Sequence, residues 1–326
     1  VATGYAAEAA RSLKARRMEV ASFHDFGVSP TGADIESGLM VAKGHNPDII
    51  VGVGGGSSLD CAKAINILFS NGGALKDYWG YGKAQKPMLP MVAVPTTAGT
   101  GSEAQTFCVI SDGKSGMRMA IGDPKAAFRV AILDPKLTVS QSKLLTASTG
   151  YDAISHALES LVTTRRTDLS ECFSRSAWRL INSGYERVIE DPNDLDARGA
   201  MLLGAHFGGM AIENSMLGAA HACANPLTIR HGVAHGVAIA VLLPHVVAWN
   251  EPVAAARYEE IYSGDLTARL RKLSAMAGLP QNLREAGVPE AALPQLAEDA
   301  ATQWSGKFNP RHFDAVGALE IYQQAY

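Results

Sequence analysis

The first 135 residues alternate between helical patterns and short apolar runs. The helical patterns have Ala, Leu and Lys at good helical spacing, and the apolar runs are typical of strands buried on both faces of a parallel sheet. Together they predict helices over residues 5–17 and 32–45 and strands over residues 19–26, 48–53, 88–94 and 130–133. Strands and helices at this interval form βαβ units, so we expect an α/β fold with a mostly parallel sheet.

The rest of the chain has a different pattern. Strand-like alternation is nearly absent after residue 135, and long helical patterns cover residues 149–163, 168–189, 197–224 and 235–249. Asp191-Pro-Asn and Asn225-Pro226 interrupt them. We therefore expect two domains, an α/β domain over residues 1–135 and an all-helical domain over residues 136–326. A doubly wound domain usually opens with a strand, whereas this chain opens in a helix, so we expect the N-terminal strand to be absent from this sequence.

Composition excludes several classes of protein. With 29 Lys and Arg against 32 Asp and Glu, the net charge is −3, which argues against nucleic acid as a partner. The longest apolar run, residues 237–243, is less than half of the roughly 18 residues that a membrane span needs. No signal-peptide pattern opens the chain, and the four cysteines lack metal-binding spacing, so we expect a cytoplasmic protein without a membrane partner.

A glycine cluster follows the predicted strand at residues 48–53. Gly54-Gly55-Gly56-Ser57-Ser58 leads directly into a helical pattern. Glycines let a pyrophosphate approach the backbone, and the free N–H groups of a helix start attract it. The alternative is a tight turn that needs glycine only for its backbone angles.

A second turn rich in glycine and hydroxyl groups follows the predicted strand at residues 88–94. It runs from Pro95 to Glu103 and contains Thr96, Thr97 and Thr100. Two such turns at the carboxyl ends of strands in one sheet favour a dinucleotide site more than either turn alone.

Histidines cluster in the second half, where six of the nine fall between residues 156 and 245. Asp152 and His156 are four residues apart in a helical pattern, which places both on one helix face. Both side chains can then reach one cation. A partner for Asp152 is expected, because an unpaired Asp on that apolar face would be costly to bury. The alternative is a solvated Asp beside a hydrogen-bonded core histidine.

His221 and His235 flank a predicted loop. Pro226 and Gly232 argue against one uninterrupted helix, so His221 should lie at a helix end and His235 near the start of the next helix. One Asp and three His suit Fe²⁺ or Zn²⁺ better than Mg²⁺ or Ca²⁺. His231 competes with His235 for this role, and spacing alone does not choose between them. His206 and His245 fit ordinary packed or surface histidines.

The chain resembles the iron-containing (group III) alcohol dehydrogenase family over essentially its whole length. The matching motifs are Gly54-Gly-Gly-Ser57 with Asp60, Pro95-Thr-Thr-Ala-Gly-Thr-Gly-Ser-Glu103, Ala131-Ile-Leu-Asp-Pro135, Gly150-Tyr-Asp152-Ala-Ile-Ser-His156-Ala-Leu-Glu159, His221 with His235-Gly236, and Asn309-Pro-Arg311. The resemblance implies a Rossmann-like dinucleotide-binding domain and a helical metal- and substrate-binding domain, the architecture of dehydroquinate synthase. It places the active site in the cleft between them.

The resemblance also implies the activity and its residues. The activity is that of a metal-dependent alcohol dehydrogenase or aldehyde reductase, which transfers a hydride between an alcohol carbon and NAD or NADP. The implied metal ligands, also the catalytic group, are Asp152, His156, His221 and His235, with Fe²⁺ or Zn²⁺ as the ion. The implied cofactor-binding residues are Gly55, Gly56, Ser57, Asp60, Thr96, Thr97, Thr100 and Arg118, where Arg118 stands at a common family lysine. The expected pocket residues are Phe107, Ile212 and Asn225, for a small or medium, mostly apolar alcohol. A homodimer is expected from the same resemblance.

Two departures from the family pattern affect these expectations. Many members have a proton-relay histidine four residues after the third metal ligand, where this chain has Asn225, whose amide does not titrate near neutral pH. The acidic residue that favours NAD over NADP follows the family's first strand, and this chain begins just past it, so the sequence does not predict the preference.

Three other functions use the same residues. A metal-dependent hydrolase could use the four ligands to activate water, although the phosphate-type turns argue against it. A lyase of the dehydroquinate synthase type shares the architecture, but the motifs here are the alcohol dehydrogenase versions. A metal-stabilised binding protein would retain the site without activity.

Overall fold

The computed structural model describes residues 3–112 and 118–326, and the chain divides into two compact units. The first unit contains residues 1–97 and 102–140, and the second contains residues 98–101 and 141–326. The short segment 98–101 therefore belongs with the helical half, which a single division at residue 135 does not anticipate.

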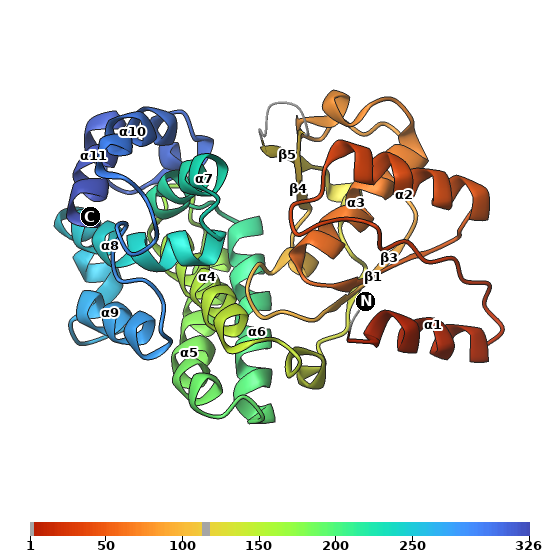
Figure 1. The fold of residues 1–326 in the computed structure, drawn as a ribbon, viewed down its shortest axis with the longest axis horizontal. Coiled ribbons are helices and arrows are strands. Elements are labelled where there is room, and N and C mark those ends of the chain that lie inside the picture. Colours follow the sequence, from red (N-terminus) through yellow and green to blue (C-terminus); the bar gives the residue numbers. More distant parts are fainter. Residues whose placement is uncertain (1–2, 113–117) are drawn as a thin grey trace. The chain divides into compact units, whose positions relative to one another are not determined.

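A parallel sheet is the centre of the first unit (Figure 1). Its strands β1 (Ile50–Gly54), β3 (Met91–Pro95) and β6 (Val130–Ala131) lie in the order β1-β3-β6. Ile50 pairs with Met91, and Val92 pairs with Val130. Helix α3 (Gly56–Asn71) follows β1 directly, and α2 (Gly32–His45) packs against α3. The predicted α/β class with a mostly parallel sheet is confirmed.

A second small sheet in this unit was not predicted from the sequence. It consists of β2 (Gly80–Tyr81), β5 (Arg118–Gly122) and β4 (Phe107–Ser111), in that order, with β4 and β5 antiparallel. Short 3-10 helices occur along the chain at Leu75–Tyr78, Ser102–Ala104, Pro124–Ala126, Pro135–Thr138, Glu290–Ala292 and Trp304–Phe308.

The strand predicted over residues 19–26 is wrong. This segment follows α1 (Tyr5–Ala15) and forms neither helix nor strand. Among the described strands, β1 pairs with β3 alone, and residues 19–26 do not pair with the other edge of β1. A strand depends on hydrogen bonds to a neighbour, and without one an apolar run stays irregular. Phe23 and Phe26 instead pack on the core around α2 and α3.

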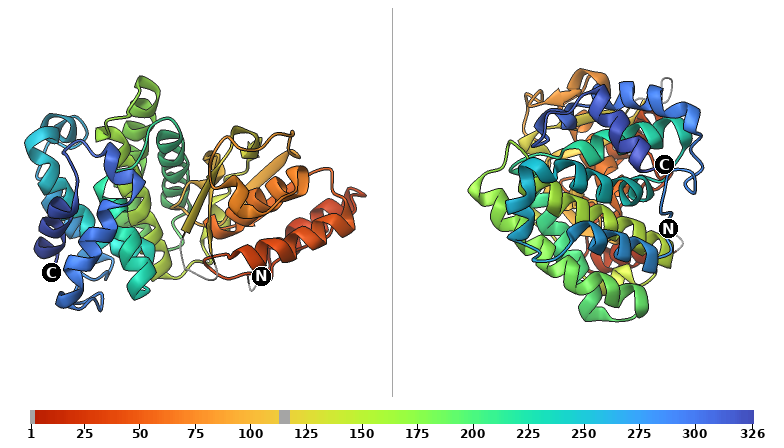
Figure 2. Two further views of the ribbon diagram at one scale, coloured as in Figure 1. Left: turned by 90° about the horizontal axis from the view of Figure 1, so that it is seen from above. Right: turned by 90° about the vertical axis from the view of Figure 1, so that its left-hand side faces the viewer.

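Helices build the described part of the second unit (Figure 2). They are α4 (Lys143–Val162), α5 (Asp168–Glu190), α6 (Leu195–Glu213), α7 (Ala219–His231), α8 (His235–Glu259), α9 (Leu266–Met276), α10 (Leu293–Ala301) and α11 (Ala315–Gln324). Helix α4 packs against α5, α6 and α8, and it is buried along most of its length. This central position protects the side chains of α4 from solvent.

One predicted helix boundary is wrong. The pattern over residues 197–224 is divided between α6 and α7, and the break falls at residues 214–218 rather than at Pro226, which lies inside α7. An internal proline removes one backbone hydrogen bond, and burial against neighbouring helices can offset that cost. Pro226 is buried, so packing here dominates over the local signal.

Among the described residues, one helix is long and apolar enough to cross a membrane by length and composition, namely α8. Of its most apolar window, 67% is buried inside the protein. A core helix has these same properties, so this helix is weak evidence for a membrane span.

His245 of α8 provides a pH-dependent stability prediction. Burial, together with Arg271, lowers its pKa from 6.5 to about 4. Between these two values the unfolded chain binds more protons than the folded chain, so the free energy of unfolding falls as pH drops through this window. We expect the free energy of unfolding, measured with urea, to fall between pH 7 and pH 4.5 by about 2 kcal/mol more in wild type than in His245→Gln. Equal losses would contradict this assignment.

Candidate metal and cofactor sites

Helix α4 carries the first two predicted metal ligands. Its start is capped by Ser142, whose side chain accepts a hydrogen bond from the Leu145 N–H. Asp152 and His156 lie one turn apart in its buried middle, and each is 4% exposed. The two residues share one helix face, as predicted. Because Asp152 is buried, the alternative of a solvated Asp is wrong.

The other two histidines begin their helices. His221 is the third residue of α7, and His235 is the first residue of α8. Between them α7 ends at Gly232, which has a left-handed φ of 66° that suits glycine. His235 begins the helix that follows the loop, as predicted, whereas His221 lies at the start of α7 and not at a helix end before Pro226, because α7 continues through Pro226.

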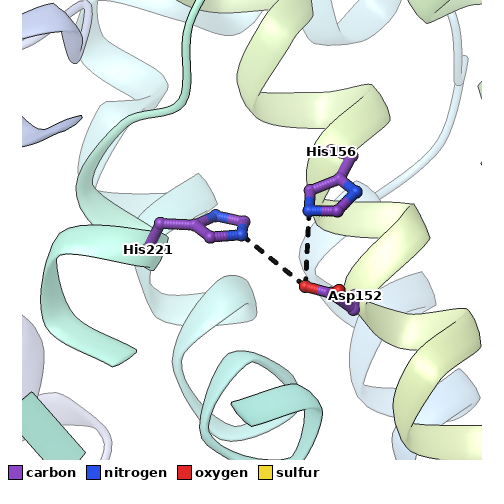
Figure 3. A group of neighbouring side chains, drawn as sticks. All are labelled: Asp152, His156 and His221. Carbon is purple, nitrogen blue, oxygen red and sulfur yellow. Dashed lines mark ion pairs between the residues drawn. The ribbon is translucent and has the colours of Figure 1, made fainter. Parts of the chain in front are cut away.

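All three imidazoles converge on one carboxylate oxygen. The Nε2 atoms of His156, His221 and His235 lie 3.4, 3.6 and 3.5 Å from Asp152 Oδ1. Figure 3 shows two of these approaches, with His156 above Asp152 on one helix and His221 reaching in from another. His221 on α7 and His235 on α8 therefore meet Asp152 of α4 at one point, although they follow it by 69 and 83 positions in the sequence.

His235 is the outermost of the four. The ligand atoms of Asp152, His156 and His221 all lie within 4.8 Å of one another, and His235 is outside this tighter group. Its side chain is 27% exposed, whereas the other three are nearly buried. In the described part of the chain His231, at the end of α7, makes no ion pair with Asp152. Of the two rivals, His235 is the one that reaches the carboxylate.

These four side chains fit a divalent metal ion. Asp152 Oδ1 is buried and accepts no hydrogen bond from the described residues, although three nitrogens surround it. Donors about 2.1 Å from one tetrahedral ion lie about 3.4 Å from each other, close to the three distances observed. The spacing is too long for good hydrogen bonds and suits ligands that share an ion.

Local electrostatics separate the histidines. Burial lowers the pKa of His156, which favours the neutral imidazole that binds metal. Burial acts in the same direction on His221, but Glu159 and Asp152 outweigh it and raise its pKa to about 9. Burial would raise the pKa of Asp152, yet the imidazoles lower it below its usual value. The carboxylates therefore favour protonation of His221, and the imidazoles favour the ionised form of Asp152.

The first glycine turn joins β1 to α3 in the first unit. Gly54 has a left-handed φ of 145°, and Gly55 caps α3 without a side-chain hydrogen bond. A Cβ atom on Gly55 would lie 3.1 Å from Thr97, so the two predicted cofactor turns are adjacent. Open backbone at a helix start beside a second turn is the arrangement that binds a pyrophosphate.

Two predicted cofactor residues have protein partners at this turn. The Ser57 hydroxyl donates to the Val28 carbonyl. Asp60 accepts hydrogen bonds from Ser102 Oγ at 2.7 Å and from the Val109 N–H at 3.0 Å. Asp60 thus ties α3 to the second turn and to β4, and its expected contact with the cofactor stays a prediction.

The remaining predicted cofactor residues lie in several elements. Thr96 and Thr97 follow β3 in the first unit, whereas Thr100 belongs to the segment 98–101 of the second unit. Gly56 is the first residue of α3, and Arg118 is the first residue of β5.

The three predicted pocket residues occupy distinct places. Phe107 begins β4 and stacks on Tyr81, with ring centroids 5.5 Å apart. Ile212 is buried near the end of α6. Asn225, within α7, donates a hydrogen bond to Gln303 Oε1 at 3.1 Å. Their roles toward a substrate stay predictions.

Sequence reasoning assigned no role to two buried charged residues. Lys63 of α3 is fully buried and donates to the carbonyls of Ser102 and Phe107 at 2.7 and 2.6 Å. Glu159 of α4 contacts His221 Nδ1. The sequence does contain a signal that could have identified Glu159 as part of the site. It stands seven residues after Asp152 and therefore lies on the same face of the helix.

Comparison with known proteins identifies the family. The model for iron-containing alcohol dehydrogenases matches residues 1–135, and the model for the C-terminal part of that family matches residues 146–326. The chain belongs to the iron-containing alcohol dehydrogenase family. The family resemblance of the sequence is thereby confirmed.

Several members of the iron-containing alcohol dehydrogenase family are similar over nearly the whole chain. An NAD-dependent methanol dehydrogenase of Bacillus methanolicus is 34% identical, covering 99% of this chain and 89% of that protein. A 1,3-propanediol oxidoreductase structure matches with a TM-score of 0.91 and 34% identity, covering 94% and 85% of the two chains. A sulfoacetaldehyde reductase of Bifidobacterium kashiwanohense, solved with NAD⁺, matches with a TM-score of 0.89 and 26% identity, covering 98% and 87%.

Proposed function

We propose that this chain is an NAD-linked, iron-dependent alcohol dehydrogenase that interconverts small alcohols and aldehydes. The observation that carries the proposal is the meeting of three Nε2 atoms at the buried Asp152 oxygen, within a chain that belongs to this family. The ligand set proposed is Asp152, His156, His221 and His235. The two glycine-rich turns that follow β1 and β3 support a dinucleotide as the second cofactor.

When bound, Fe²⁺ supplies a Lewis acid for the alcohol or aldehyde oxygen, and NAD supplies the hydride acceptor. The chain's own residues provide a fixed, dry setting for that chemistry. Asp152 contributes the negative charge that holds a cation, and the three imidazoles complete the set as neutral donors. Burial of Asp152 and His156 excludes water, which strengthens each electrostatic contact.

Proton transfer is the step in which this chain departs from its family. Asn225 stands at the relay position, and its amide, which donates to Gln303, carries no titratable proton. A water molecule would then have to take up the proton that leaves the alcohol and pass it to bulk solvent, because the Asn225 side chain would not take it up.

Asn225→His is expected to restore a titratable group there. An imidazole with an ordinary pKa near 6.5 can accept a proton above that pH, so alcohol oxidation should rise about tenfold above pH 7. The kcat profile should gain a limb near pH 6.5, whereas Asn225→Gln should keep the wild-type profile. A histidine variant with an unchanged profile would show that this position carries no proton.

The substrate is proposed to be a small or medium, mostly apolar alcohol, because Phe107 and Ile212 are apolar. The test is a panel of aldehydes and alcohols assayed with NADH, NADPH and their oxidised forms after loading with Fe²⁺. NADH-dependent reduction that disappears with a chelator and returns with Fe²⁺ supports the proposal. Metal-dependent ester or amide hydrolysis without any NADH oxidation would favour a hydrolase and overturn it.

Assembly and location follow the same line of inference. We propose a homodimer, on the basis of the family resemblance. We also propose that the protein is cytoplasmic, because the cysteines Cys61, Cys108, Cys172 and Cys223 are free, as is usual in a reducing compartment. Sedimentation equilibrium measures the dimer, and a monomer at micromolar concentration would contradict it.

A further inference from the structure

Three N–H groups at the start of α7 are bound by side chains from other parts of the chain. The N-cap of α7 is Gly218, which has no side chain to cap the helix. Glu159 Oε1, on α4, accepts hydrogen bonds from the N–H groups of Gly218 and Ala220 at 3.1 and 2.8 Å. Asn309 Oδ1 accepts from the Ala219 N–H at 3.2 Å. The first turn of α7 is thus held from outside the helix.

The same Glu159 also contacts His221. Its second oxygen, Oε2, lies against His221 Nδ1, while His221 Nε2 points to Asp152. When Nε2 binds the candidate ion, the ring proton is on Nδ1, and the Nδ1–H group donates a hydrogen bond to Glu159. One carboxylate therefore fixes both the backbone that carries His221 and the orientation of its ring. Carboxylates in this position orient metal-binding histidines and increase their basicity.

Asn309 is itself fixed. Its Nδ2 donates to Asn250 Oδ1 at 2.7 Å, and Asn250 Nδ2 donates to Asn309 Oδ1 at 3.1 Å. Both residues are buried. This reciprocal amide pair connects the start of α7 to α8, which is the helix that carries His235.

Charge balance gives Glu159 a second effect. The carboxylates that act on His156 and His221 are Asp152 and Glu159, both 4% exposed. Two buried negative charges and one divalent cation sum to zero, and buried charge is stable when it is paired. A neutral residue at position 159 would leave the loaded site with a net positive charge.

We propose that Glu159 is a positioning residue of the metal site, which holds His221 in its ligating tautomer and neutralises the second charge of the bound ion. This inference rests on the proposed function, because it needs an ion at Asp152, His156, His221 and His235. Asn309 assists Glu159 by accepting a hydrogen bond from the Ala219 N–H in the first turn of α7.

The test is a Co²⁺ titration of the metal-free protein, with visible absorption as the readout. Co²⁺ binds such N and O ligands, and its absorption reports coordination geometry. Glu159→Gln keeps the size and an acceptor oxygen but removes the charge. We expect its Kd for Co²⁺ to rise about 10- to 100-fold, with an altered spectrum at saturation. Glu159→Asp, which keeps the charge, should recover part of the affinity and serves if Glu159→Gln does not fold.

Ser160→Ala is the matched control. Ser160 is the next residue on α4 and is also buried, and its hydroxyl bonds the His156 carbonyl and Ser174 without contacting an imidazole. It should lower the melting temperature while leaving the Kd for Co²⁺ within about twofold of wild type. Wild-type affinity and spectrum in folded Glu159→Gln would overturn this inference alone. Failure of wild type to bind Co²⁺ would overturn the proposed function with it.

Discussion

His235→Ala is expected to lose bound iron and turnover together. His235 Nε2 lies 3.5 Å from Asp152 Oδ1, and it is the most exposed member of the four. Its loss leaves three donors and opens the site to water. Removal of a residue that hydrogen-bonds to a metal ligand lowers metal affinity 10- to 100-fold, so removal of a ligand itself should lower it at least roughly 10³-fold. Metal analysis after gel filtration, together with NADH-linked turnover, measures both effects.

His231→Ala is the control for this experiment. His231 is the same residue type four positions earlier, at the last turn of α7, and it makes no ion pair with Asp152 in the described part of the chain. We expect iron content and turnover near wild type. If His231→Ala loses iron while His235→Ala keeps it, the ligand assignment is wrong.

Gly236→Ala should displace His235 without touching any ligand. A Cβ atom at position 236 would lie 2.2 Å from the backbone oxygen of Ser148, far inside van der Waals contact. Ser148 is on α4, one turn before Asp152, so the start of α8 must move away from α4. Overpacking of this kind costs about 1–3 kcal/mol, and a shift of about 1 Å at a reacting centre can cost about 10²-fold in rate.

The measurements for Gly236→Ala are urea unfolding and iron-dependent turnover. Gly44→Ala in α2 is the matched control, because the added methyl group meets nothing within 4 Å. The control should be neutral or slightly stabilising, since alanine favours helix. Wild-type turnover in Gly236→Ala would show that the contact between α4 and α8 does not position His235.

Local patterns predicted the elements of this fold better than their ends. The glycine turn after β1 and the pair Asp152 and His156 were visible because each depends on neighbours within a turn or two of chain. The strand over residues 19–26 was wrong because pairing depends on a partner far away in sequence. The helix break near Pro226 was wrong for a similar reason, since the start of α7 is fixed by Glu159 and Asn309.

The metal site shows the same limit. Spacing within α4 indicated two ligands, but the choice of His235 over His231 needed the family resemblance, because both lie at plausible positions beside the loop. The distances to Asp152 depend on the packing of α7 and α8 against α4. Glu159 is part of a motif that the chain shares with the family. Its contacts with the start of α7 were not predictable from local spacing, because they involve residues 59 to 62 positions away.

The most direct test of the metal site is a crystal structure of the iron-loaded enzyme, with anomalous data collected at the iron edge. The account predicts one strong anomalous peak about 2.1 Å from an Asp152 oxygen and from the Nε2 atoms of His156, His221 and His235. An active crystal whose iron peak lies elsewhere, or is absent from these four side chains, would contradict it.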